Sequence, residues 1–339
     1  SPARLYAKTG IQKQNFNTIY QLYADKKNGR LQYAKYFLMM PEYLSFKLTG
    51  VCKNEYTNAT TTGLVNANAK TWDSEIISVL GLPKELFSAL NTPSSIVGDL
   101  SANIQKAVGF NSTVLFAPSH DTASAVCACP MQDDDLYISS GTWSLIGTEI
   151  TEPILNDNAR KLNFTNEGGI DYRFRFLKNY MGMWFFQNIR RNLNKSMTYD
   201  EMMELAKRAN SYKYFDVNDS TLVAPKNMID AIGTLIGSDD LGLILNSAYH
   251  SLAKSYSEAV MEIEAVTGKR FNAIHIVGGG CQDKYLNVLT RDYTGKSVTA
   301  GPIEATATGN IVSQIMRDKK IPLATAREIV KNSFDIKEI

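Results

Sequence analysis

The stretch VLFAPSHDTASAV, residues 114–126, joins a short apolar run to a polar turn and a row of small residues. The run from Val114 to Ala117 predicts a buried strand, and the small residues after Asp121 predict a helix. Layered α/β proteins bind ligands where their strands end, so Asp121 stands at a position suited to a functional carboxylate. Asp is also a common helix cap, and this stretch alone leaves that structural interpretation open.

A carboxylate at this position has the chemistry of a general base. An alcohol is a poor nucleophile, and a positioned carboxylate can accept its proton while a new P–O bond forms. Such assistance typically contributes about 10²- to 10⁴-fold in rate, or roughly 3–5 kcal/mol. Asp121 is therefore our candidate catalytic residue.

Two glycine-containing turns follow this stretch. SSGTWSL, residues 139–145, joins two apolar runs, which predicts a β-hairpin whose turn can present N–H groups to phosphate oxygens. An ordinary hairpin turn is the simpler explanation. HIVGGGCQDKYLN, residues 275–287, places three glycines between a strand and a helix, where a ligand can approach the backbone closely. Neither the dinucleotide fingerprint nor the P-loop sequence occurs.

The rest of the second half alternates strands and helices, which indicates an α/β layered fold. Its most regular pattern is a helix from Asp239 to Thr267 with Gly268 at its end, and core packing explains the apolar face of that helix. Thr198 and Glu201 form a capping box for another helix. The remaining predictions are helices over 17–23 and 41–50, extended structure and turns over 54–66, a helix opened by Asp73, strands over 170–177 and 298–300, and a helix over 303–316 with a small-residue face.

The composition is that of an ordinary globular chain. Of its 339 residues 44% are apolar and 21% are charged, and the net charge is +2. The length predicts roughly two domains. No apolar stretch is long enough to span a bilayer, no signal-peptide core opens the chain, and the scattered Lys and Arg residues predict no nucleic-acid partner. The cysteines predict reduced thiols in the cytoplasm rather than a zinc site; they are Cys52, Cys127, Cys129 and Cys281.

The order of these motifs is more informative than any one of them. A strand with Asp121, a Gly-Thr hairpin, a long helix, and a strand with three glycines follow one another along the chain. They resemble the FGGY carbohydrate kinases, and within that family the rhamnulokinase branch. The stretches that carry the resemblance are TGIQKQNFNTIYQL (9–22), EYTNATTTGLVN (55–66), SHDTASAV (119–126), SSGTWSL (139–145), TNEGGIDYRFRFLKNYMGMWFFQ (165–187) and IVGGGCQD (276–283).

The resemblance implies an α/β, actin-like ATPase fold with two ribonuclease-H-like lobes. The sugar-binding lobe would cover residues 1–132 and the nucleotide-binding lobe residues 133–339. The implied reaction is ATP-dependent phosphorylation of L-rhamnulose at its 1-hydroxyl, as part of L-rhamnose degradation, with Mg²⁺ bridging the phosphates. The implied base is Asp121, the implied sugar-binding residues are His120, Asp121, Thr122 and Asn179, and the implied nucleotide-binding residues are Thr142, Gln187 and Gly279.

Several of these residues also have structural interpretations. Asn179 can cap the helix that includes Trp184, and Gln187 can lie on the solvent-facing edge of that helix. Cys281 can be a packed thiol. Trp143 and Trp184 fit a core position better than a platform for sugar stacking.

One family feature has no counterpart in the chain. The D-x-G-T/S strand–turn–strand, which in the family binds phosphate and Mg²⁺ in the first lobe, is absent from these residues. We therefore expect an incomplete first lobe, and a fragment or truncated gene product with little or no kinase activity on its own. Two alternative functions stay open: a kinase for another ketose such as L-fuculose, and a non-catalytic remnant that binds nucleotide or a partner.

Overall fold

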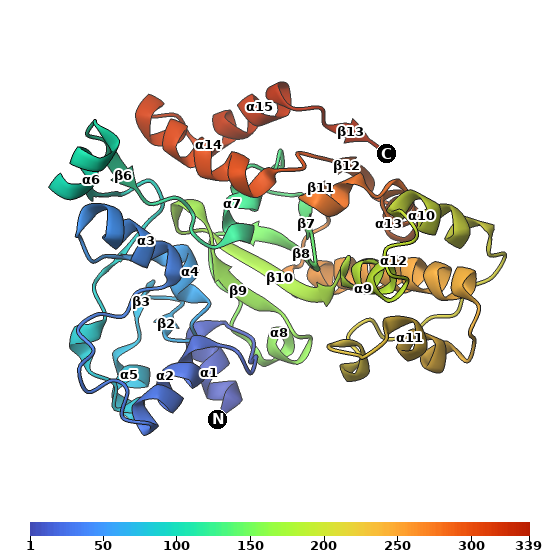
Figure 1. Cartoon of the computed structure of the whole chain (residues 1–339), viewed down its shortest axis with the longest axis horizontal. Helices are drawn as coiled ribbons and strands as arrows, with labels where there is room; N and C mark the ends of the chain where they lie inside the picture. The colour runs from blue at the N-terminus through green and yellow to red at the C-terminus, as the bar shows by residue number, and fades with distance from the viewer. The chain divides into compact units, whose positions relative to one another are not determined.

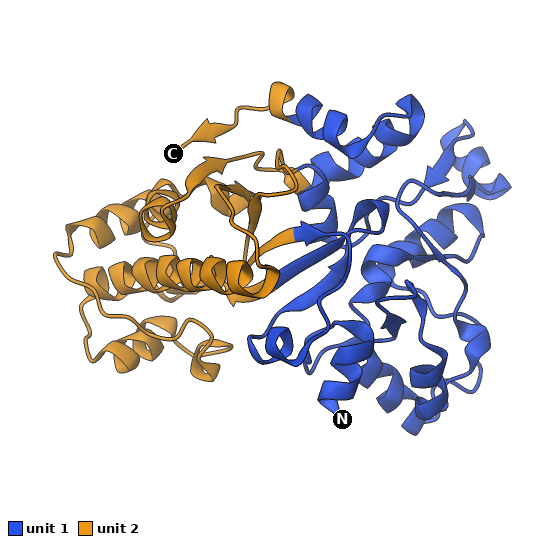
Figure 2. Cartoon of the chain, turned by 180° about the vertical axis from the view of Figure 1, so that it is seen from behind, with its two compact units in different colours: residues 1–128, 149–177, 306–330 blue, residues 129–148, 178–305, 331–339 orange.

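The computed structural model describes all 339 residues, which form two compact units (Figure 2). Unit 1 comprises residues 1–128, 149–177 and 306–330, and unit 2 comprises residues 129–148, 178–305 and 331–339. Each unit is thus assembled from three separate segments. The family resemblance divides the chain after residue 132 into a sugar-binding and a nucleotide-binding lobe. The two compact units do not test that division, which stays a prediction. None of the helices combines the length and the hydropathy that crossing a membrane requires.

Unit 1 consists of short helices and short strands (Figure 1). Its helices are α1 (Pro2–Thr9), α2 (Thr18–Lys27), α3 (Met40–Thr49), α4 (Tyr56–Thr60), α5 (Ser74–Leu80), α6 (Ala102–Val108), α7 (Asp121–Cys127), α8 (Asp157–Lys161) and most of α14 (Ala305–Lys319) and α15 (Leu323–Ser333). Its strands are β1 (Asn54–Glu55), β2 (Val65–Asn66), β3 (Thr71–Trp72), β4 (Leu90–Asn91), β5 (Ile96–Asp99), β6 (Thr113–Leu115), β9 (Thr165–Gly168) and the first half of β10 (Phe174–Met181). The β1–β4 pair is parallel, and β2–β3, β5–β6 and β9–β10 are antiparallel.

The helix α7 packs closely against α14 in unit 1. A side chain at Gly309 of α14 would overlap the carbonyl oxygen of Ser124 in α7, so only glycine fits at this crossing. Close packing is thus confirmed at Gly309, and Ala305 is buried, whereas Ala307 of the predicted small-residue face is exposed. One apolar cluster joins α7, α14 and α15; its buried members are Cys127, Ala128, Ile170, Val312, Met316, Leu323, Ala326 and Val330.

Unit 2 is built on a mixed sheet that begins with the predicted hairpin. The strands, in spatial order, are β13 (Lys337–Glu338), β12 (Ser297–Ala300), β11 (Ala273–Val277), β7 (Leu136–Ser140) and most of β8 (Trp143–Ile150). The outer pairs β13–β12 and β7–β8 are antiparallel. The inner pairs β12–β11 and β11–β7 are parallel, and Ile276 of β11 lies between Ala300 of β12 and Ile138 of β7. The parallel arrangement brings the carboxyl ends of β7 and β11 to one edge of the sheet.

Five helices accompany this sheet. They are α9 (Trp184–Asn192), α10 (Tyr199–Arg208), α11 (Met228–Ile236), α12 (Leu241–Thr267) and α13 (Lys284–Thr294). The long helix α12 contacts α10, α11 and α13 (Figure 1). Its ends have local causes: the Asp240 carboxylate accepts from the N–H of Leu243 at 2.7 Å, and Gly268 takes the left-handed conformation (φ 69°). The predicted helix is confirmed, with its end at Thr267 as expected and its start at Leu241 rather than Asp239.

Three predictions about local structure are wrong. Residues 54–66 contain the helix α4, because the Glu55 carboxylate caps the N–H groups of Thr57 and Asn58. The strand expected over 170–177 begins only at Phe174, since Asp171 and Tyr172 have left-handed φ angles of 53° and 57°. The strand before Asp121 is β6, which the sequence predicts to be buried. Its first residue is exposed and its other two residues are only half-buried.

Candidate active site

Asp121 is the first residue of α7, and 81% of its side chain is exposed. Its Oδ1 accepts hydrogen bonds from the backbone N–H and the hydroxyl of Thr122, at 2.6 and 3.3 Å. From α14 the hydroxyl of Thr306 donates to the carbonyl oxygen of Asp121 at 3.2 Å. The backbone of Asp121 is thus tied into unit 1 while its carboxylate stays accessible to a ligand.

A buried carboxylate holds the turn that leads into Asp121. Glu55 is fully buried, and its Oε2 accepts from the hydroxyls of Ser119 (2.6 Å) and Thr57 (2.7 Å). The Thr57 hydroxyl oxygen in turn accepts from the backbone N–H of His120 at 3.3 Å. Burial raises the pKa of Glu55. Side chains of β1 and α4 therefore hold Ser119 and the backbone of His120 in place.

A second buried carboxylate supports the first. Glu42 of α3 is 1% exposed and accepts from the backbone N–H groups of Glu55 and Met39, both at 2.7 Å, and from the amide of Asn54 at 2.8 Å. Burial raises the pKa of Glu42 to about 7. The turn before Asp121 is thus held by hydrogen bonds to buried polar side chains.

His120 lies beside the carboxylate of Asp121. Its Nδ1 is 3.6 Å from Asp121 Oδ1, and this nitrogen is buried without a hydrogen bond. Burial and the positive charge of Arg175 lower the pKa of His120. The imidazole is therefore neutral at neutral pH and can serve as a hydrogen-bonding group. The structure thus brings together three of the predicted site residues, His120, Asp121 and Thr122.

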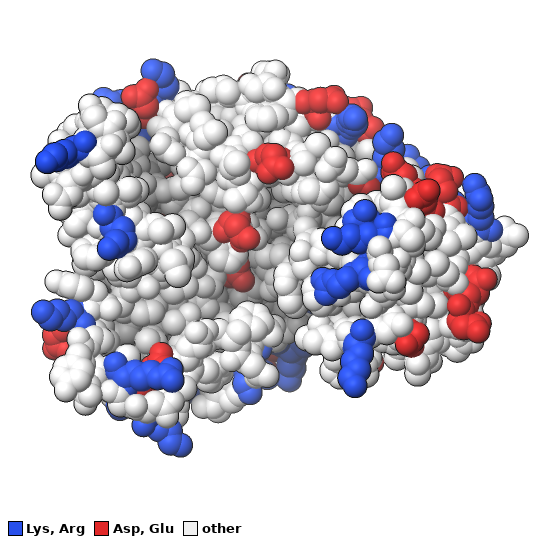
Figure 3. Space-filling model, viewed as in Figure 1, with Lys and Arg blue, Asp and Glu red and all other residues white.

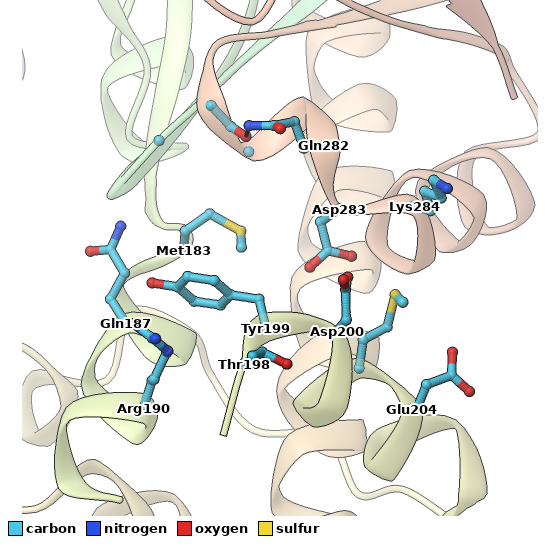
Figure 4. A pocket seen from close by; sticks show the side chains of 14 residues that line it. Met183, Gln187, Arg190, Thr198, Tyr199, Asp200, Glu204, Gln282, Asp283 and Lys284 are labelled. Atoms are coloured by element: carbon cyan, nitrogen blue, oxygen red, sulfur yellow. Dashed lines mark hydrogen bonds between the residues drawn. The ribbon is translucent and has the colours of Figure 1, made fainter. Parts of the chain in front are cut away.

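Unit 2 contains a pocket of about 860 Å³ (Figure 4). Helices α9 and α10 form one wall, and the glycine turn after β11 and the start of α13 form another. Side chains of both signs and several apolar groups line it; the lining residues are Gly141, Met183, Gln187, Arg190, Thr198, Tyr199, Asp200, Met203, Glu204, Gly279, Gly280, Gln282, Asp283 and Lys284. This volume suits a ligand of drug or nucleotide size.

The three glycines after β11 have different roles. Side chains at Gly278 or Gly280 would collide with Ser140 at the end of β7, and Gly278 also has a φ of 87°. At Gly279, by contrast, nothing lies within 4 Å of the place where a Cβ would be. Gly278 and Gly280 therefore let the turn pack on the sheet, and Gly279 exposes bare backbone to the pocket.

The hairpin turn between β7 and β8 reaches the same pocket. The Gly141 N–H donates to the carbonyl of Trp143 at 2.8 Å and is thus used within the turn, so the predicted contact of phosphate with this turn would depend on its other groups. The exposed hydroxyl of Thr142 donates to the Gln187 side chain at 3.3 Å. The structure thus brings Thr142 and Gln187 together, and Gln187 and Gly279 line one pocket.

Two pocket residues have clear structural partners as well. Asp283 caps α13 through the N–H of Leu286 (3.0 Å) and accepts from the Tyr249 hydroxyl (2.8 Å), and burial raises its pKa. The Arg190 guanidinium lies 5.1 Å from the centre of the Tyr199 ring. In Figure 4 Met183, Gln187 and Tyr199 gather on one side of the pocket and Asp283 on the other.

The sequence did not single out several of these residues. Tyr199 and Arg190 line the pocket, yet the only local signal near them was the capping box of Thr198, which is confirmed as the start of α10. Glu55 is also part of the site, and its burial depends on contacts with residues far away in the sequence. Isolated polar residues of this kind carry no spacing signal that a single sequence can reveal.

The remaining predicted residues lie elsewhere in unit 2. Asn179 is half-buried in the second half of β10, and Met183 rather than Asn179 occupies the N-cap of α9, so the capping alternative is wrong. Trp143 is 47% exposed, so its expected core position is also wrong. Cys281 is buried, and burial raises its pKa to about 11, which fits a packed thiol.

The charged side chains form no single-signed stripe on the face in Figure 3. Lys and Arg side chains are interspersed there with Asp and Glu side chains. The buried carboxylates of Glu42 and Glu55 behind Asp121 are local electrostatic features of the site.

Comparisons with known proteins cover nearly the whole chain. Residues 1–128 match the N-terminal domain of the FGGY family of carbohydrate kinases, and residues 136–317 match its C-terminal domain. The chain is 47% identical to the rhamnulokinase of Halalkalibacterium halodurans over 98% of its own length and 73% of that relative. It is 39% identical to the rhamnulokinase of Bacillus subtilis, over 99% of this chain and 71% of the relative.

Solved structures agree in fold. A glycerol kinase of Plasmodium falciparum with ADP superposes with a TM-score of 0.79 at 14% identity, over 99% of this chain and 70% of that one. A gluconate kinase of Lactobacillus acidophilus gives a TM-score of 0.78 at 16% identity, over 99% and 69%. The chain is thus shorter than the proteins it matches.

Proposed function

The chain belongs to the FGGY family of carbohydrate kinases, and from this premise we propose that the protein, as its gene encodes it, transfers the γ-phosphoryl group of ATP to the 1-hydroxyl of L-rhamnulose. It is a rhamnulokinase-like sugar kinase with the α/β, actin-like ATPase fold of that family. The observation that carries the choice of sugar is its similarity to curated rhamnulokinases over nearly all of this chain. The matches of the two domain profiles support a sugar lobe over residues 1–132 and a nucleotide lobe over 133–339.

Asp121 is the general base in this proposal. Its accessible carboxylate accepts the proton of the sugar 1-hydroxyl while the oxygen attacks the γ-phosphorus and ADP leaves. Two features support this role: the carboxylate is exposed to a ligand, and its backbone is fixed by Thr306 and by the Glu55 layer. His120 and Thr122 bind the sugar beside it, and Asn179 is the fourth sugar-binding residue that we carry over from the family motif.

ATP occupies the unit 2 pocket in this proposal. The open space above Gly279 supports close approach of the adenosine portion, and Gln187 lines the same pocket. In this proposal the exposed hydroxyl of Thr142, which lies beside Gln187, contacts the phosphates. A nucleotide bound in this pocket would contact the backbone of Gly279 directly, because glycine has no side chain there.

Mg²⁺ accompanies ATP in the proposed reaction. No cluster of three or more His, Cys, Asp or Glu side chains forms a metal site in the chain, so these residues do not fit an all-protein metal cage. Mg²⁺ in phosphoryl-transfer sites is held largely by the substrate phosphates and water, where it neutralises their charge. We place the reaction in the cytoplasm, where ATP is available and where the four free cysteines stay reduced.

A substrate panel tests the proposal in the protein as its gene encodes it. ADP release is followed with ATP and Mg²⁺ in the presence of L-rhamnulose, L-fuculose, L-ribulose or glycerol, and the sugar phosphate is identified by phosphorus-31 NMR. We expect the highest kcat/KM with L-rhamnulose and a product esterified at C1. Higher kcat/KM with another ketose would overturn the choice of sugar, and ATP binding without turnover of any sugar would support a non-catalytic remnant.

A further inference from the structure

The turn between β7 and β8 is held by residues at the start of α9, far along the chain. It consists of Gly141 and Thr142, and we call it the Gly-Thr turn. The carbonyl oxygen of Thr142 accepts from the backbone N–H groups of Gly182 and Trp184, at 3.0 and 3.1 Å. The carbonyl oxygen of Gly141 accepts from the N–H of Met183 at 2.9 Å. The start of α9 thus engages both carbonyl groups of the turn.

Gly182 allows this close approach because it has no side chain. A Cβ at Gly182 would lie 2.8 Å from the backbone nitrogen of Ser144 and 2.8 Å from the carbonyl carbon of Trp143, and it would overlap the Ser144 hydroxyl. Backbone atoms of a strand cannot turn aside as the end of a flexible side chain can. Any residue larger than glycine would therefore push the turn away from α9.

Both strands that carry the turn are anchored by other elements of unit 2. The buried hydroxyl of Tyr256 on α12 donates to the buried hydroxyl of Ser144 in β8 at 2.6 Å. In β7, Ser140 packs against Gly278 and Gly280. Because the strands are held on these sides, a displacement at the start of α9 would act on the turn between them.

The side chain of Thr142 is held by the same helix. Its exposed hydroxyl donates to the side chain of Gln187 at 3.3 Å, and Gln187 and Met183 line the same pocket (Figure 4). A hairpin turn can close without such support, and here the Gly141 N–H closes it by donating to the Trp143 carbonyl at 2.8 Å. The additional bonds from α9 therefore fix the position of the turn rather than its formation.

We propose that the contact of Gly182 with Ser144 positions the Thr142 hydroxyl for phosphoryl transfer, which makes Gly182 and Tyr256 positioning residues of the reaction. This inference rests on the proposed function, in which Thr142 contacts the phosphates of ATP. A group that contacts the reacting atoms must be held closely, because a displacement of about 1 Å can cost about a hundredfold in rate. A contact that serves only folding is the competing explanation, and the experiments below separate the two.

The first experiment compares Gly182→Ala with Gly233→Ala in the protein as its gene encodes it. Gly233 is buried in α11, which does not line the pocket, and a Cβ there would lie 2.6 Å from the carbonyl oxygen of Ser238. Both variants crowd backbone atoms, so both should lower the melting temperature. We expect kcat to fall at least about tenfold in Gly182→Ala alone, with the Kd for ATP unchanged within about twofold. Calorimetric titration with ATP counts the folded binding sites, so that kcat is expressed per folded site.

A second variant, Tyr256→Phe, loosens the same contact without adding bulk. It removes the bond to Ser144 and keeps the aromatic ring, so the protein should fold. We expect kcat to fall about three- to fivefold, with an unchanged Kd for ATP. This variant tests the inference even if Gly182→Ala does not fold.

A double-mutant cycle with Thr142→Val identifies the residue through which both variants act. Valine keeps the shape of threonine and removes its hydroxyl. In the Thr142→Val background we expect Gly182→Ala and Tyr256→Phe to change kcat by less than about twofold, because the hydroxyl that they position is gone. Gly233→Ala should leave kcat unchanged in both backgrounds. The cycle uses the panel sugar that wild type phosphorylates fastest.

The outcomes distinguish this inference from the proposed function. Wild-type kcat in folded Gly182→Ala or in Tyr256→Phe, or additive losses in the Thr142→Val background, would overturn the inference and leave the kinase assignment intact. A wild-type protein that binds ATP but phosphorylates no sugar of the panel would contradict the proposed function and this inference together.

Discussion

The two candidate ligand regions are built in opposite ways. In unit 1 the turn at Asp121 rests on buried polar groups, among them the carboxylates of Glu42 and Glu55 and the guanidinium of Arg175. In unit 2 the pocket is shaped by backbone, because Gly278 and Gly280 pack on Ser140 and leave Gly279 facing open space. The first region is organised by side-chain hydrogen bonds, and the second by the absence of side chains.

This difference matches the ligand that we propose for each region. A sugar is read through hydroxyl groups that need specific donors and acceptors, and buried polar groups supply them at fixed positions. A nucleotide can lie against bare backbone, which makes close approach more important than side-chain chemistry. Substitutions in unit 1 should therefore act on turnover, sugar binding and pH dependence, and substitutions at the glycines on packing and ATP binding.

The largest expected effect is that of Asp121→Asn. An amide cannot accept the proton of the attacking hydroxyl, so we expect kcat to fall by at least about a hundredfold, within the 10²- to 10⁴-fold range of general base catalysis. The Kd for ATP and the melting temperature should not change, since the side chain is 81% exposed. Steady-state kinetics and calorimetry measure both, and Asp157→Asn on the surface of α8 is the control. Near-normal turnover would remove Asp121 from the base role.

The second prediction concerns the pH dependence of stability. Burial raises the pKa of Glu42 from its ordinary 4.5 to about 7, so folding favours its protonated form. Its contribution to stability is therefore complete below about pH 4.5 and is lost as the pH rises through about 7, a change of about 3 kcal/mol. The side chain of the Glu42→Gln variant cannot ionise. The free energy of unfolding of the variant, relative to that of wild type, should therefore increase by this amount between pH 4.5 and 8. Denaturant titrations check this, and a constant difference would contradict a buried, titrating Glu42.

Gly280→Ala and Gly279→Ala separate packing from ligand approach in the pocket. The new methyl group at position 280 would overlap Ser140, so we expect about 1–3 kcal/mol of destabilisation. At position 279 the methyl group meets nothing within 4 Å, so stability should stay the same while ATP affinity falls several-fold. Thermal unfolding and ATP titration measure the two effects. Unchanged ATP affinity in Gly279→Ala would mean that the nucleotide does not approach this backbone.

The smallest effect is expected for Ser119→Ala. It removes the 2.6 Å hydrogen bond to Glu55, worth about 1 kcal/mol, and loosens the turn that precedes His120. We expect a few-fold drop in kcat with an unchanged Kd for ATP, and recovery in Ser119→Thr, which keeps the hydroxyl. Ser45→Ala, whose hydroxyl bonds only within its own helix, is the control. If Ser119→Thr is as slow as Ser119→Ala, the hydroxyl is not what positions the turn.

Elements with local signals could be predicted from the sequence. The caps of α12, the capping box at Thr198 and the turn between β7 and β8 each depend on residues within a few positions of one another. The collinear motifs likewise led to the FGGY family and to the rhamnulokinase branch, which the comparisons confirm. Such features need no knowledge of distant contacts.

What could not be predicted depends on contacts between distant residues. The helix α4 starts within a Thr-rich segment at Glu55, a residue that is not among the common helix caps, and the burial of Glu55 depends on Ser119, which lies 64 positions away. The buried pairing of Arg175 with Glu167 is hidden in a stretch that alternates like an ordinary strand. Asp171 and Tyr172 interrupt that stretch with left-handed φ angles for which we have no local sequence signal.

The most direct measurement of the division between the two regions is a paired titration. L-rhamnulose and ATP are titrated separately into wild type, His120→Asn and Gly279→Ala in the protein as its gene encodes it. The division predicts that His120→Asn weakens the binding of L-rhamnulose alone and that Gly279→Ala weakens the binding of ATP alone. If each variant weakens both ligands to the same extent, or if His120→Asn weakens only ATP, the assignment of sugar to unit 1 and of nucleotide to unit 2 is contradicted.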